Sequence, residues 1–475
     1  MARTRDITSE GGGAHRLNIQ PDHFAPDNQP KPNQRPPPVR CEPRWRAEAP
    51  SLQAVIGQLT TALLEHEHAE HPRQRQRRVA DERRFRAAVE CIACNLLALS
   101  IAAPDRCLAI PLANAASRYT PIFGKTARKV IDLMQELGLA VKVKGYPFRG
   151  PTTIQATGKL AKYLPMGKSD WNALRLEHEP RAIILTAADV AGPDEDEAFQ
   201  EIARRTYPPD IGPWLDKVDA EMQAINAALR SARIECGNGR GAYLSERPDK
   251  PMAVLLTPHH RTLRRYFNGS WDRGGRLFGG FWQNMTRADR FRHLRIGGEP
   301  VALVDYGQLF LRLAYAEANI DPPKGDLYDL TGADATRPQW KELRNARKKM
   351  INALFFCTGP LKQWPGAGPR ERAEMRNAFP PGTKPSHEIQ AIKCKHAPIA
   401  ALFESGHGHR FMRQESDLIT VVVLALLKRG IIALPIHDAV LVAERHAAEA
   451  RAVMENEAKR ATGADIPASV ETVAD

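Results

Sequence analysis

The sequence of 475 residues contains little cysteine, no long apolar run and no surplus of acidic residues. Seven cysteines in a chain of this length do not form a disulfide framework, which indicates a reducing compartment. No window reaches the roughly 18 consecutive apolar residues of a membrane span. The basic N-terminus lacks the apolar segment of a secretory signal. These absences exclude a disulfide-stapled scaffold and predict a cytoplasmic protein that does not enter a membrane.

Metal-binding spacings of cysteine and histidine are also scarce. Cys91 and Cys94 form a lone C-x-x-C within FRAAVECIACNLLALSIA, and no second pair follows at zinc spacing. We interpret them as two small apolar residues one helical turn apart. The histidines of EHEHAEH stand in a highly charged stretch, which favours a solvated helix surface over a metal site.

What the sequence does contain is positive charge. Lys and Arg number 68 against 55 Asp and Glu, a formal net charge of +13. Such a surplus is typical of proteins that hold a phosphate backbone, although many basic proteins bind any polyanion. The length predicts two or three domains with linkers, and 37 prolines indicate stretches that do not pack.

Composition divides the chain into four regions. Residues 1–45 hold GGG, KPNQ and RPPPV with few apolar residues, which predicts a disordered Pro-rich basic tail. Residues 46–165 begin with helical periodicity and end in the module described next. Residues 166–250 combine an acidic stretch with the amphipathic WLDKVDAEMQAINAALRSAR, which predicts a helical linker or a thumb-like segment. Residues 251–475 carry the segments with recognisable chemistry.

Residues 106–165 have the element order of a winged-helix module. TARKVIDLMQELGL is an amphipathic helix that closes at Gly138. AVKVK and TTIQA alternate like strands on either side of the basic turn YPFRGP. A plain helix–hairpin packing unit has the same order and is the alternative. If the module grips duplex DNA, the candidates for backbone contacts are Lys125, Arg128, Lys129, Lys142, Lys144 and Arg149.

Two carboxylates in the last region stand at the ends of apolar strands. VALV precedes Asp305, and IIALPI is joined to AVLVA at His437-Asp438, which predicts a hairpin with an acid at its tip. Carboxylates at the ends of buried strands are costly unless they bind cations. If the strands are neighbours, Asp305 and Asp438 can hold two Mg²⁺ ions about 3.5–4 Å apart, with Mn²⁺ as a substitute. That geometry stabilises the attacking 3′-oxygen and the leaving pyrophosphate of an in-line displacement.

The segment LRNARKKMINALFFCTG, residues 343–359, predicts a cationic helix. Arg344, Lys348, Asn352 and Phe356 follow at intervals of four and therefore share one face. A cationic face that becomes aromatic suits a triphosphate at one end and a stacked base at the other. Taken alone, this segment is better interpreted as an exposed basic face that runs into a buried helix end.

These segments resemble the motifs of family A DNA polymerases and of the related bacteriophage-type single-subunit RNA polymerases. DYGQLFLR, which starts at Asp305 and ends at Arg312, is similar to motif A, DYSQIELR. His437-Asp438 fits motif C, whose usual forms are HDE in the DNA enzymes and HDS in the RNA enzymes. The resemblance covers residues 271–475.

Two further motifs stand in the matching order. Arg344, Lys348 and Phe356 fit motif B, R-x3-K-x7-[YF], the fingers helix that grips the incoming nucleotide. DRGGR, from Asp272 to Arg276, fits the D-x-x-G-R element of the RNA enzymes, and its GRL resembles the TGRLS element of the DNA enzymes. Each motif alone is weak, whereas four in the correct order are fairly specific.

The resemblance implies an α+β fold with a right-hand polymerase palm, an antiparallel sheet with helices. The fingers must be reduced, because the interval from motif A to motif C is short. Asp305 and Asp438 would hold the metal ions, with the Tyr306 carbonyl as a further ligand. Lys348 and Arg344 would bind the triphosphate.

The remaining site residues follow from the same resemblance. Phe356 would stack on the base or sugar, with Asn352 on the same face and Phe310 near the sugar. His437 and Arg276 would contact the primer terminus. Asp272 and Arg312 belong to the motifs that contact nucleic acid.

Several positions depart from both branches of the superfamily. Ala439 replaces the carboxylate of HDE, and Cys357-Thr358 follows Phe356 where a glycine is usual. Phe310 stands where the DNA enzymes have a glutamate and the RNA enzymes a small residue. A bulky Phe310 excludes a ribose 2′-hydroxyl, and Phe356 lacks the tyrosine hydroxyl that helps the RNA enzymes to select ribonucleotides. Both changes favour deoxynucleotides.

The sequence therefore predicts a DNA-templated, Mg²⁺-dependent nucleotidyltransferase, with deoxynucleoside triphosphates slightly favoured over ribonucleoside triphosphates. Its partners would be a DNA template with a primer or nascent strand and nucleoside triphosphates, and the oligomeric state is left open. One alternative is a single-subunit RNA polymerase. Another is a catalytically inactive palm-fold protein that binds DNA in replication or regulation.

Overall fold

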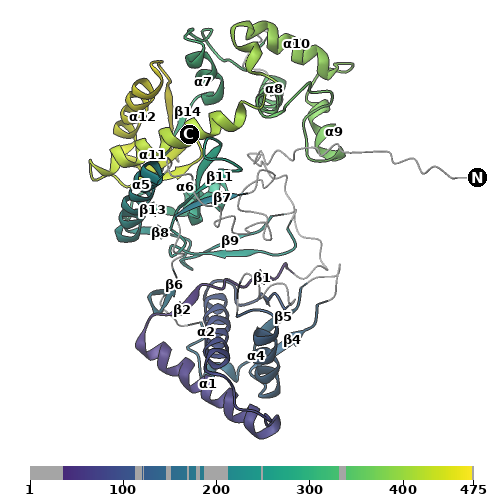
Figure 1. Cartoon of the computed structure of the whole chain (residues 1–475), viewed down its shortest axis with the longest axis vertical. Helices are drawn as coiled ribbons and strands as arrows, with labels where there is room; N and C mark the ends of the chain where they lie inside the picture. Colours follow the sequence, from purple (N-terminus) through teal and green to yellow (C-terminus); the bar gives the residue numbers. More distant parts are fainter. Residues whose placement is uncertain are drawn as a thin grey trace, which may run out of the picture.

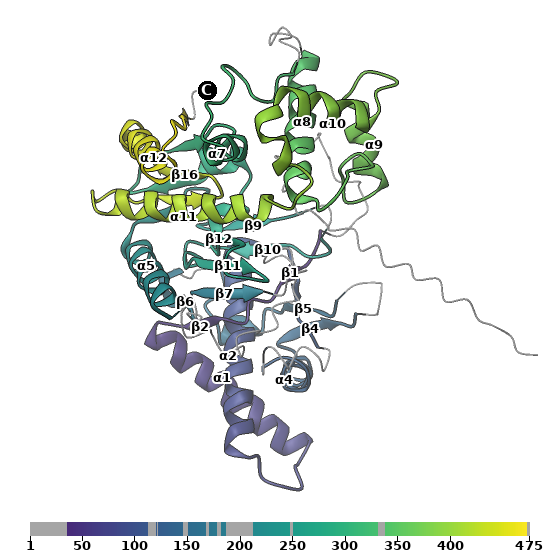
Figure 2. The same cartoon turned by 45° about the horizontal axis from the view of Figure 1, so that its top comes forward.

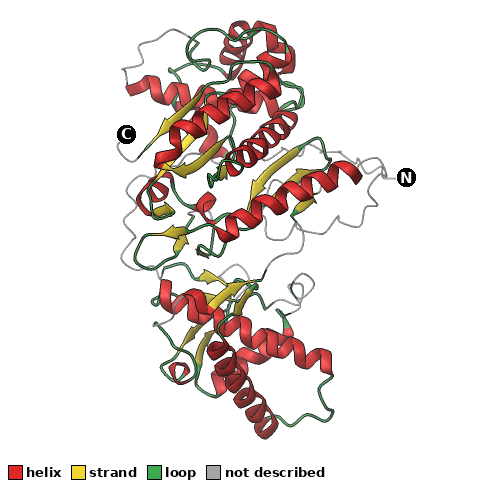
Figure 3. Ribbon diagram, turned by 90° about the vertical axis from the view of Figure 1, so that its left-hand side faces the viewer, coloured by secondary structure: helices red, strands yellow, loops and turns green. Residues whose placement is uncertain are grey.

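The computed structural model describes residues 36–112, 120, 122–145, 151–167, 171–177, 182–186, 212–247, 250–330 and 338–472. The chain is an α+β protein built around two hydrophobic cores. One core lies in the N-terminal part and the other in the C-terminal part, and the two parts are stacked along the long axis of the molecule (Figure 1; Figure 3).

The N-terminal part consists of a helical hairpin, a third helix and short strands. Its elements are β1 (Val39–Arg40), β2 (Trp45–Ala47), α1 (Pro50–Glu70), α2 (Val79–Ala102), β3 (Leu108–Ala109), α4 (Lys125–Glu136), β4 (Ala140–Val143), β5 (Thr153–Ala156), η1 (Leu160–Lys162), η2 (Trp171–Ala173) and β6 (Leu174–Leu176). β1, β3, β5 and β4 form one four-stranded sheet in that order.

Helix α2 is the centre of the N-terminal core. It is long and apolar enough to cross a membrane by length and composition, but 72% of its apolar window is buried inside this part of the protein. Cys91 and Cys94 lie within the buried stretch as free thiols, in agreement with their interpretation as small apolar residues. Burial raises the pKa of the Cys94 thiol.

The predicted order of helix, strand and strand is confirmed for α4, β4 and β5, and residues 146–150 of the predicted turn lie outside the described residues. α4 ends at Glu136, and Gly138 takes a left-handed φ of +70° just beyond it, where a residue with a Cβ would be strained. β4 pairs with β5 in antiparallel register, and β5 pairs with β3. The resulting order β3-β5-β4 makes a three-stranded antiparallel unit beside α4.

Two predicted boundaries were wrong. The disordered tail was predicted to reach residue 45, whereas β1 and β2 are part of the N-terminal fold and the side chains of Val39, Cys41 and Trp45 are buried. Residues 1–35 of that tail lie outside the described residues. The region 166–250 was predicted to be helical, and it does contain the expected long helix, but it also contains strands that pair with both parts of the molecule.

The C-terminal part contains the remaining elements. They are β7 (Ile183–Thr186), α5 (Gly212–Ser231), β8 (Ile234–Cys236), β9 (Tyr243–Ser245), β10 (Val254–Leu256), β11 (Arg264–Asn268), β12 (Gly274–Phe278), η4 (Phe281–Asn284), α6 (Arg287–His293), β13 (Leu294–Ile296), β14 (Val301–Tyr306), α7 (Leu309–Glu317), α8 (Pro338–Phe356), α9 (Pro369–Asn377), α10 (Pro385–Lys395), η5 (Ala397–Leu402), α11 (Gly408–Leu427), β15 (Leu434–Ile436), β16 (Ala439–Ala443), η6 (Glu444–His446), α12 (Ala447–Thr462) and β17 (Ala468–Glu471).

The central sheet of this part is antiparallel throughout, with the order β15-β16-β14-β17. β16 is buried along its whole length because the run AVLVA is apolar on both faces. α11 and α12 pack against each other and against this sheet. Figure 2 shows α11 between the sheet and the hairpin formed by β11 and β12, so that one helix contacts both.

The two cores share the segment around β10. Val39 and Ala253 form an isolated parallel β-bridge. The backbone N–H of Ala253 donates to the carbonyl of Pro38 at 2.9 Å, and the N–H of Arg40 donates to the carbonyl of Ala253 at 2.8 Å. Side chains of Ala253 and Leu255 belong to the N-terminal core, whereas Leu256 belongs to the C-terminal core. A strand from the second half of the chain therefore completes the fold of the first half.

Candidate active site

The strands β14 and β16 bring the two predicted aspartates together. Asp305 lies opposite Ala439 in the antiparallel register, and residues opposite each other in such a pair have Cα atoms about 5 Å apart. Asp438 directly precedes Ala439, and its carbonyl accepts a hydrogen bond of 3.3 Å from the backbone N–H of Tyr306. The predicted hairpin with an acid at its tip is confirmed, with His437-Asp438 as the two-residue turn between β15 and β16.

The turn itself holds an uncommon backbone conformation. His437 has a φ of +52°, which non-glycine residues rarely adopt. Its ring is packed edge-on against Phe278 of β12, with ring centroids 5.9 Å apart. Burial, with a further contribution from Arg276 and Arg290, lowers the pKa of His437 to about 3. The imidazole is therefore neutral at neutral pH.

Tyr328 is a buried tyrosine whose hydroxyl pKa is influenced by the charges of both Asp305 and Asp438. It lies in the segment between α7 and α8 and is 5% exposed. Burial raises the pKa of its hydroxyl, and the negative charges of Asp438, Asp326 and Asp305 raise it further. The phenol therefore stays protonated and is a hydrogen-bond donor beside the aspartate pair.

The turn after β14 is fixed by side chains. Gln308 has a left-handed φ of +59°, and its amide donates to Asp326 at 2.6 Å and accepts from the backbone N–H of Leu327 at 3.2 Å. Nε of Arg312 donates to the carbonyl of Gly307 at 2.9 Å. The hydroxyl of Tyr306 donates to the carbonyl of Met454 at 2.6 Å. The end of β14, where Asp305 and the predicted ligand carbonyl of Tyr306 lie, is thus tightly held.

The segment of residues 326–329 is anchored from its other side by the end of α10. Nζ of Lys395 donates to the carbonyls of Asp326 and Asp329. Nε2 of His396 hydrogen-bonds to the carbonyl of Leu327 at 3.0 Å. These bonds hold the segment that carries Tyr328, whose hydroxyl is near enough to Asp305 and Asp438 for their charges to raise its pKa.

The cationic helix predicted from motif B is α8, which starts earlier than expected, at Pro338, and ends at Phe356. Arg344 forms an ion pair with Asp326, and its guanidinium lies 5.1 Å from the ring centre of Tyr328. Lys348, one turn further on, is exposed, and Asn352 is half-buried. The face of α8 that was predicted to bind a triphosphate is therefore connected through Asp326 and Tyr328 to the two aspartates.

The aromatic residues predicted to select the nucleotide are in contact. The rings of Phe310 and Phe356 have centroids 5.9 Å apart, and Phe310 is 6.0 Å from Phe411 of α11. His409 packs edge-on against Phe356 at 5.0 Å. A Cβ on Gly408 would lie 2.7 Å from the Phe356 ring, so glycine is required for this packing.

The DRGGR segment forms the turn and second strand of the β11–β12 hairpin. Asp272 lies in the turn, where a hydrogen bond from the Ser270 hydroxyl lowers the pKa of its carboxyl. Arg276 lies in β12 and was predicted to contact nucleic acid near the primer end. Its guanidinium forms a two-pronged ion pair with Glu415 of α11, at 2.6 Å and 2.9 Å.

The donor set fits a magnesium site that is completed by substrate. Among the described residues there is no group of three or more His, Cys, Asp or Glu side chains that could hold a metal ion. Mg²⁺ commonly binds through one or two carboxylates together with waters and substrate phosphates, and two neighbouring aspartates satisfy that pattern. Arg276, whose charge acts on Asp438, is held by Glu415, so Glu415 offsets the cation beside the aspartate pair.

The predicted DNA-contacting side chains of the N-terminal module differ in their surroundings. Nζ of Lys142 is 2.5 Å from Asp132, and Nζ of Lys129 is 4.0 Å from Glu67. Arg128 donates to the carbonyl of Leu112 at 2.9 Å. Lys125 and Lys144 are exposed, whereas Arg149 lies outside the described residues.

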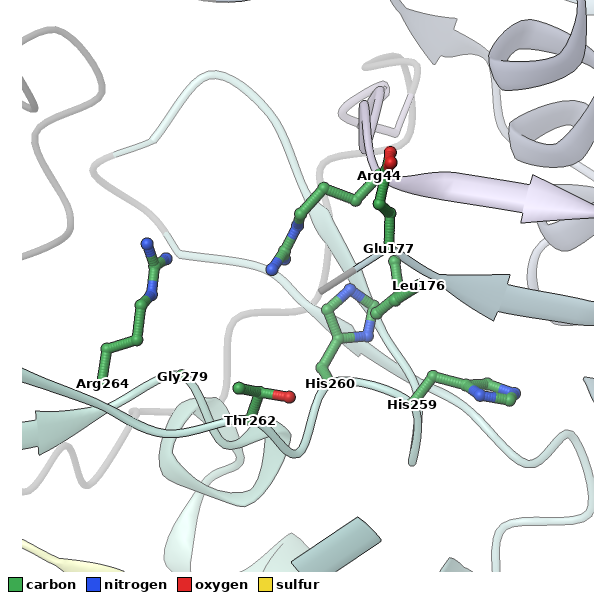
Figure 4. A pocket seen from close by; sticks show the side chains of 8 residues that line it. All are labelled: Arg44, Leu176, Glu177, His259, His260, Thr262, Arg264 and Gly279. Carbon is green, nitrogen blue, oxygen red and sulfur yellow. The ribbon is translucent and has the colours of Figure 1, made fainter. Parts of the chain in front are cut away.

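A small pocket lies between the two parts of the molecule, and neither aspartate lines it. Figure 4 shows the side chains of Arg44 and Arg264 reaching toward the same space, with the Arg44 guanidinium between Arg264 and the ring of His260 in this view. Arg44 is held by Glu42 through hydrogen bonds of 2.8 Å and 2.9 Å, and Glu177 also lines the space. The lining residues come from both parts of the molecule, so we assign the pocket to the junction between the two cores.

Sequence reasoning missed Gln308, Asp326, Tyr328 and Glu415. Glu415 stands among other polar residues at the start of RQESDLITVVVLALL, and Asp326 and Tyr328 stand in a polar loop, so no local pattern distinguishes any of the three. Comparison with protein-family models and with curated protein sequences gives no match to this chain.

Proposed function

We propose that this protein is a DNA-templated nucleotidyltransferase, a polymerase whose metal-binding residues are Asp305 and Asp438. The observation that carries the proposal is the convergence of four segments that are far apart in the sequence. Asp305 lies near the end of β14 and Asp438 lies in the turn that leads into its partner strand β16, and Tyr328 and Arg344 are linked to them from the fingers side. Arg276 approaches Asp438 from β12.

Each converging segment has a chemical task in this proposal. The two aspartates hold magnesium, which supplies Lewis-acid stabilisation of the attacking and leaving oxygens. Arg344 and Lys348 bind the triphosphate from α8, and the Tyr328 phenol offers a donor at the same place. His437 and Arg276 address the primer terminus. The tight bonding around Gln308 and Gly307 supports a site whose parts are held in place before substrate binds.

The contact between Phe310 and Phe356 supports a preference for deoxynucleotides. Two packed rings leave less room beside the sugar than a small residue at position 310 would, and neither ring has a hydroxyl that could bind a 2′-oxygen. The two rings are braced by Phe411 and His409, so they resist displacement. We therefore expect deoxynucleotides to be incorporated faster than ribonucleotides.

Primer extension tests the proposal directly. Wild-type protein with a DNA primer–template, Mg²⁺ or Mn²⁺ and either nucleotide class is expected to extend the primer. Asp305→Asn and Asp438→Asn should each lower the rate about 10³-fold or more, because the loss of one metal ligand removes several kcal/mol of transition-state stabilisation. Asp465→Asn, at an 89% exposed side chain after α12, is the matched control and should extend normally.

The outcomes separate the candidate functions. No incorporation by wild-type protein with either metal would contradict the proposal. Faster incorporation of ribonucleotides would favour a single-subunit RNA polymerase. Duplex binding through residues 106–165 that is unchanged in both aspartate variants, without incorporation, would favour a DNA-binding protein without turnover, an alternative suggested by Ala439 in motif C.

A further inference from the structure

A buried carboxylate on α11 lies next to the candidate site and was not part of any motif. Glu415 is 1% exposed, and both of its oxygens accept hydrogen bonds from Arg276, from Nε at 2.6 Å and from Nη2 at 2.9 Å. The two residues are 139 positions apart in the chain. A side-on bidentate pair of this kind fixes the plane of a guanidinium as well as its position.

Burial and a nearby negative charge make the ion pair of Arg276 and Glu415 a poor source of stability. Burial raises the pKa of the Glu415 carboxyl, Arg276 opposes this effect, and the negative charge of Asp438 adds to it. A buried ion pair repays its desolvation poorly, and a second carboxylate nearby makes the cost larger. A carboxylate kept at this place therefore points to a role in orienting Arg276.

Arg276 has a competing partner close by. Its charge acts on Asp438 and on His437, so all three groups lie within electrostatic reach of one another. If Glu415 were neutral, the guanidinium would be drawn to Asp438, the nearby carboxylate that the proposed reaction needs for its cation. With Nε and one N–H of Nη2 engaged by Glu415, both N–H groups of Nη1 and the second N–H of Nη2 are left to donate elsewhere.

We propose that Glu415 is a positioning residue that directs Arg276 to the primer end of bound nucleic acid and keeps it from pairing with Asp438. This inference rests on the proposed polymerase function. It adds a residue outside the four motifs to the machinery that holds the primer.

The surroundings of the pair are built to keep it in place. The hydroxyl of the next residue, Ser416, donates to the carbonyl of Gly275, which also accepts from Nε of Arg265 at 2.9 Å. A Cβ on Gly275 would meet the Phe267 ring at 3.1 Å, and its φ is +83°. The strand that carries Arg276 is thus also bonded to α11 at the neighbouring residue, Gly275.

A double-mutant cycle tests the inference. We would measure the dissociation constant of a fluorescent DNA with a recessed 3′ end, in EDTA, for wild type, Glu415→Gln, Arg276→Ala and the double variant. Glu415→Gln is expected to weaken binding about 10- to 100-fold, because a misplaced binding group loses about this much. In the Arg276→Ala background, the same change should have no further effect.

Two controls separate positioning from folding. Asp417→Asn breaks a second arginine–carboxylate pair between α11 and the same hairpin, that of Arg265, and should leave binding near wild type. The variant Arg276→Met with Glu415→Met replaces the buried pair by apolar side chains of similar size and should fold with near-normal stability. It should nevertheless bind the recessed end as poorly as Arg276→Ala does.

The results distinguish this inference from the proposed function. If wild-type protein extends primers and Glu415→Gln binds and extends as wild type does, the role of Glu415 is overturned and the polymerase proposal stands. If Glu415→Gln weakens binding equally in both backgrounds, Glu415 does not act through Arg276 and the inference is again overturned. If wild-type protein neither extends primers nor binds the recessed end, both proposals fail together.

Discussion

His396 is a fully buried histidine whose two ring nitrogens both have partners. Nδ1 lies 3.0 Å from the hydroxyl of Tyr315, and Nε2 lies 3.0 Å from the carbonyl of Leu327. A carbonyl can only accept, so Nε2 carries the proton and Nδ1 accepts from the tyrosine. Burial lowers the pKa of His396 to about 4. Through Leu327, this neutral ring supports the segment that holds Tyr328.

The lowered pKa of His396 predicts that the protein loses stability in mild acid. The unfolded chain takes up a proton as the pH falls below about 6.5, whereas the folded chain does so only near pH 4. Between these values the unfolded state binds more protons, so the free energy of unfolding falls as the pH falls, by about 3 kcal/mol at most. Denaturant unfolding at pH 7.5 and at pH 4.5 measures this loss.

A matched pair of variants isolates the contribution of His396. His396→Gln cannot titrate and should show a smaller difference between the two pH values than wild type does. His387→Gln changes an exposed histidine on the same helix, α10, and should retain the full difference. Equal pH dependence in all three proteins would refute the assignment.

At the scale of single residues, the sequence predicted only features that depend on neighbouring residues in the chain. Asp305 and Asp438 were identifiable because each stands where an apolar strand ends. Glu415 and Tyr328 were not, because their importance comes from partners brought together by folding, such as Arg276, which is 139 residues from Glu415. The binding role of Arg276 was predicted from a motif, but its ion pair was not.

Helix α11 is the element that joins the candidate site. It contacts β12, the central sheet, α7, α8 and α12, and its residues reach both Arg276 and Phe356. Its first residue, Gly408, lies against the Phe356 ring without space for a Cβ. Small changes at the start of this helix should therefore shift Phe356 at the proposed nucleotide site.

Gly408→Ala tests that connection. The new Cβ would lie 2.7 Å from the Phe356 ring, so the ring or the helix must shift, at a cost of about 1–3 kcal/mol in unfolding free energy. We also expect a higher KM for the nucleotide with a smaller change in kcat, because Phe356 contacts the substrate in the proposed function. Gly57→Ala, in α1 with open space around it, should instead be neutral or stabilising by up to about 1 kcal/mol. A normal KM in Gly408→Ala would count against the stacking role of Phe356.

At the scale of elements, long periodic segments were predictable and short strands were not. The amphipathic helices α4 and α5, the cationic helix α8 and the β15–β16 hairpin follow from local periodicity and were expected. Strands such as β6 and β7 are three or four residues long and form by pairing with β2 and β11, which are distant in sequence. No local pattern distinguishes such segments from loops, so the region 166–250 was predicted as helical only.

At the scale of the whole molecule, β10 lies between the two cores and faces both. Leu255 is 6% exposed in the N-terminal core, and its neighbour Leu256 is 7% exposed in the C-terminal core. Successive side chains of a strand point to opposite faces, which explains how one strand serves two cores. Composition did not predict this shared strand, because the sharing depends on non-local pairing.

Replacing each of these leucines should weaken a different half of the protein. Leu255→Ala and Leu256→Ala each create a cavity worth about 2–4 kcal/mol. We expect Leu255→Ala to increase hydrogen exchange in α2 and α4, and Leu256→Ala to increase it in the C-terminal core instead. If both variants affect the same regions, the two cores do not respond separately, and the assignment of the two side chains to different cores would need revision.

The shared strand also bears on how the protein is made. Chains emerge from the ribosome N-terminal end first at about 5–20 residues per second, and domains generally fold as units as they appear. Here α1, α2 and α4 are synthesised long before Ala253 and Leu255, the residues that close their core. During translation, apolar surface of the first half stays exposed to solvent until β10 has been synthesised. We expect nascent chains stalled before this strand to be recognised by chaperones, and chains stalled well after it to escape them.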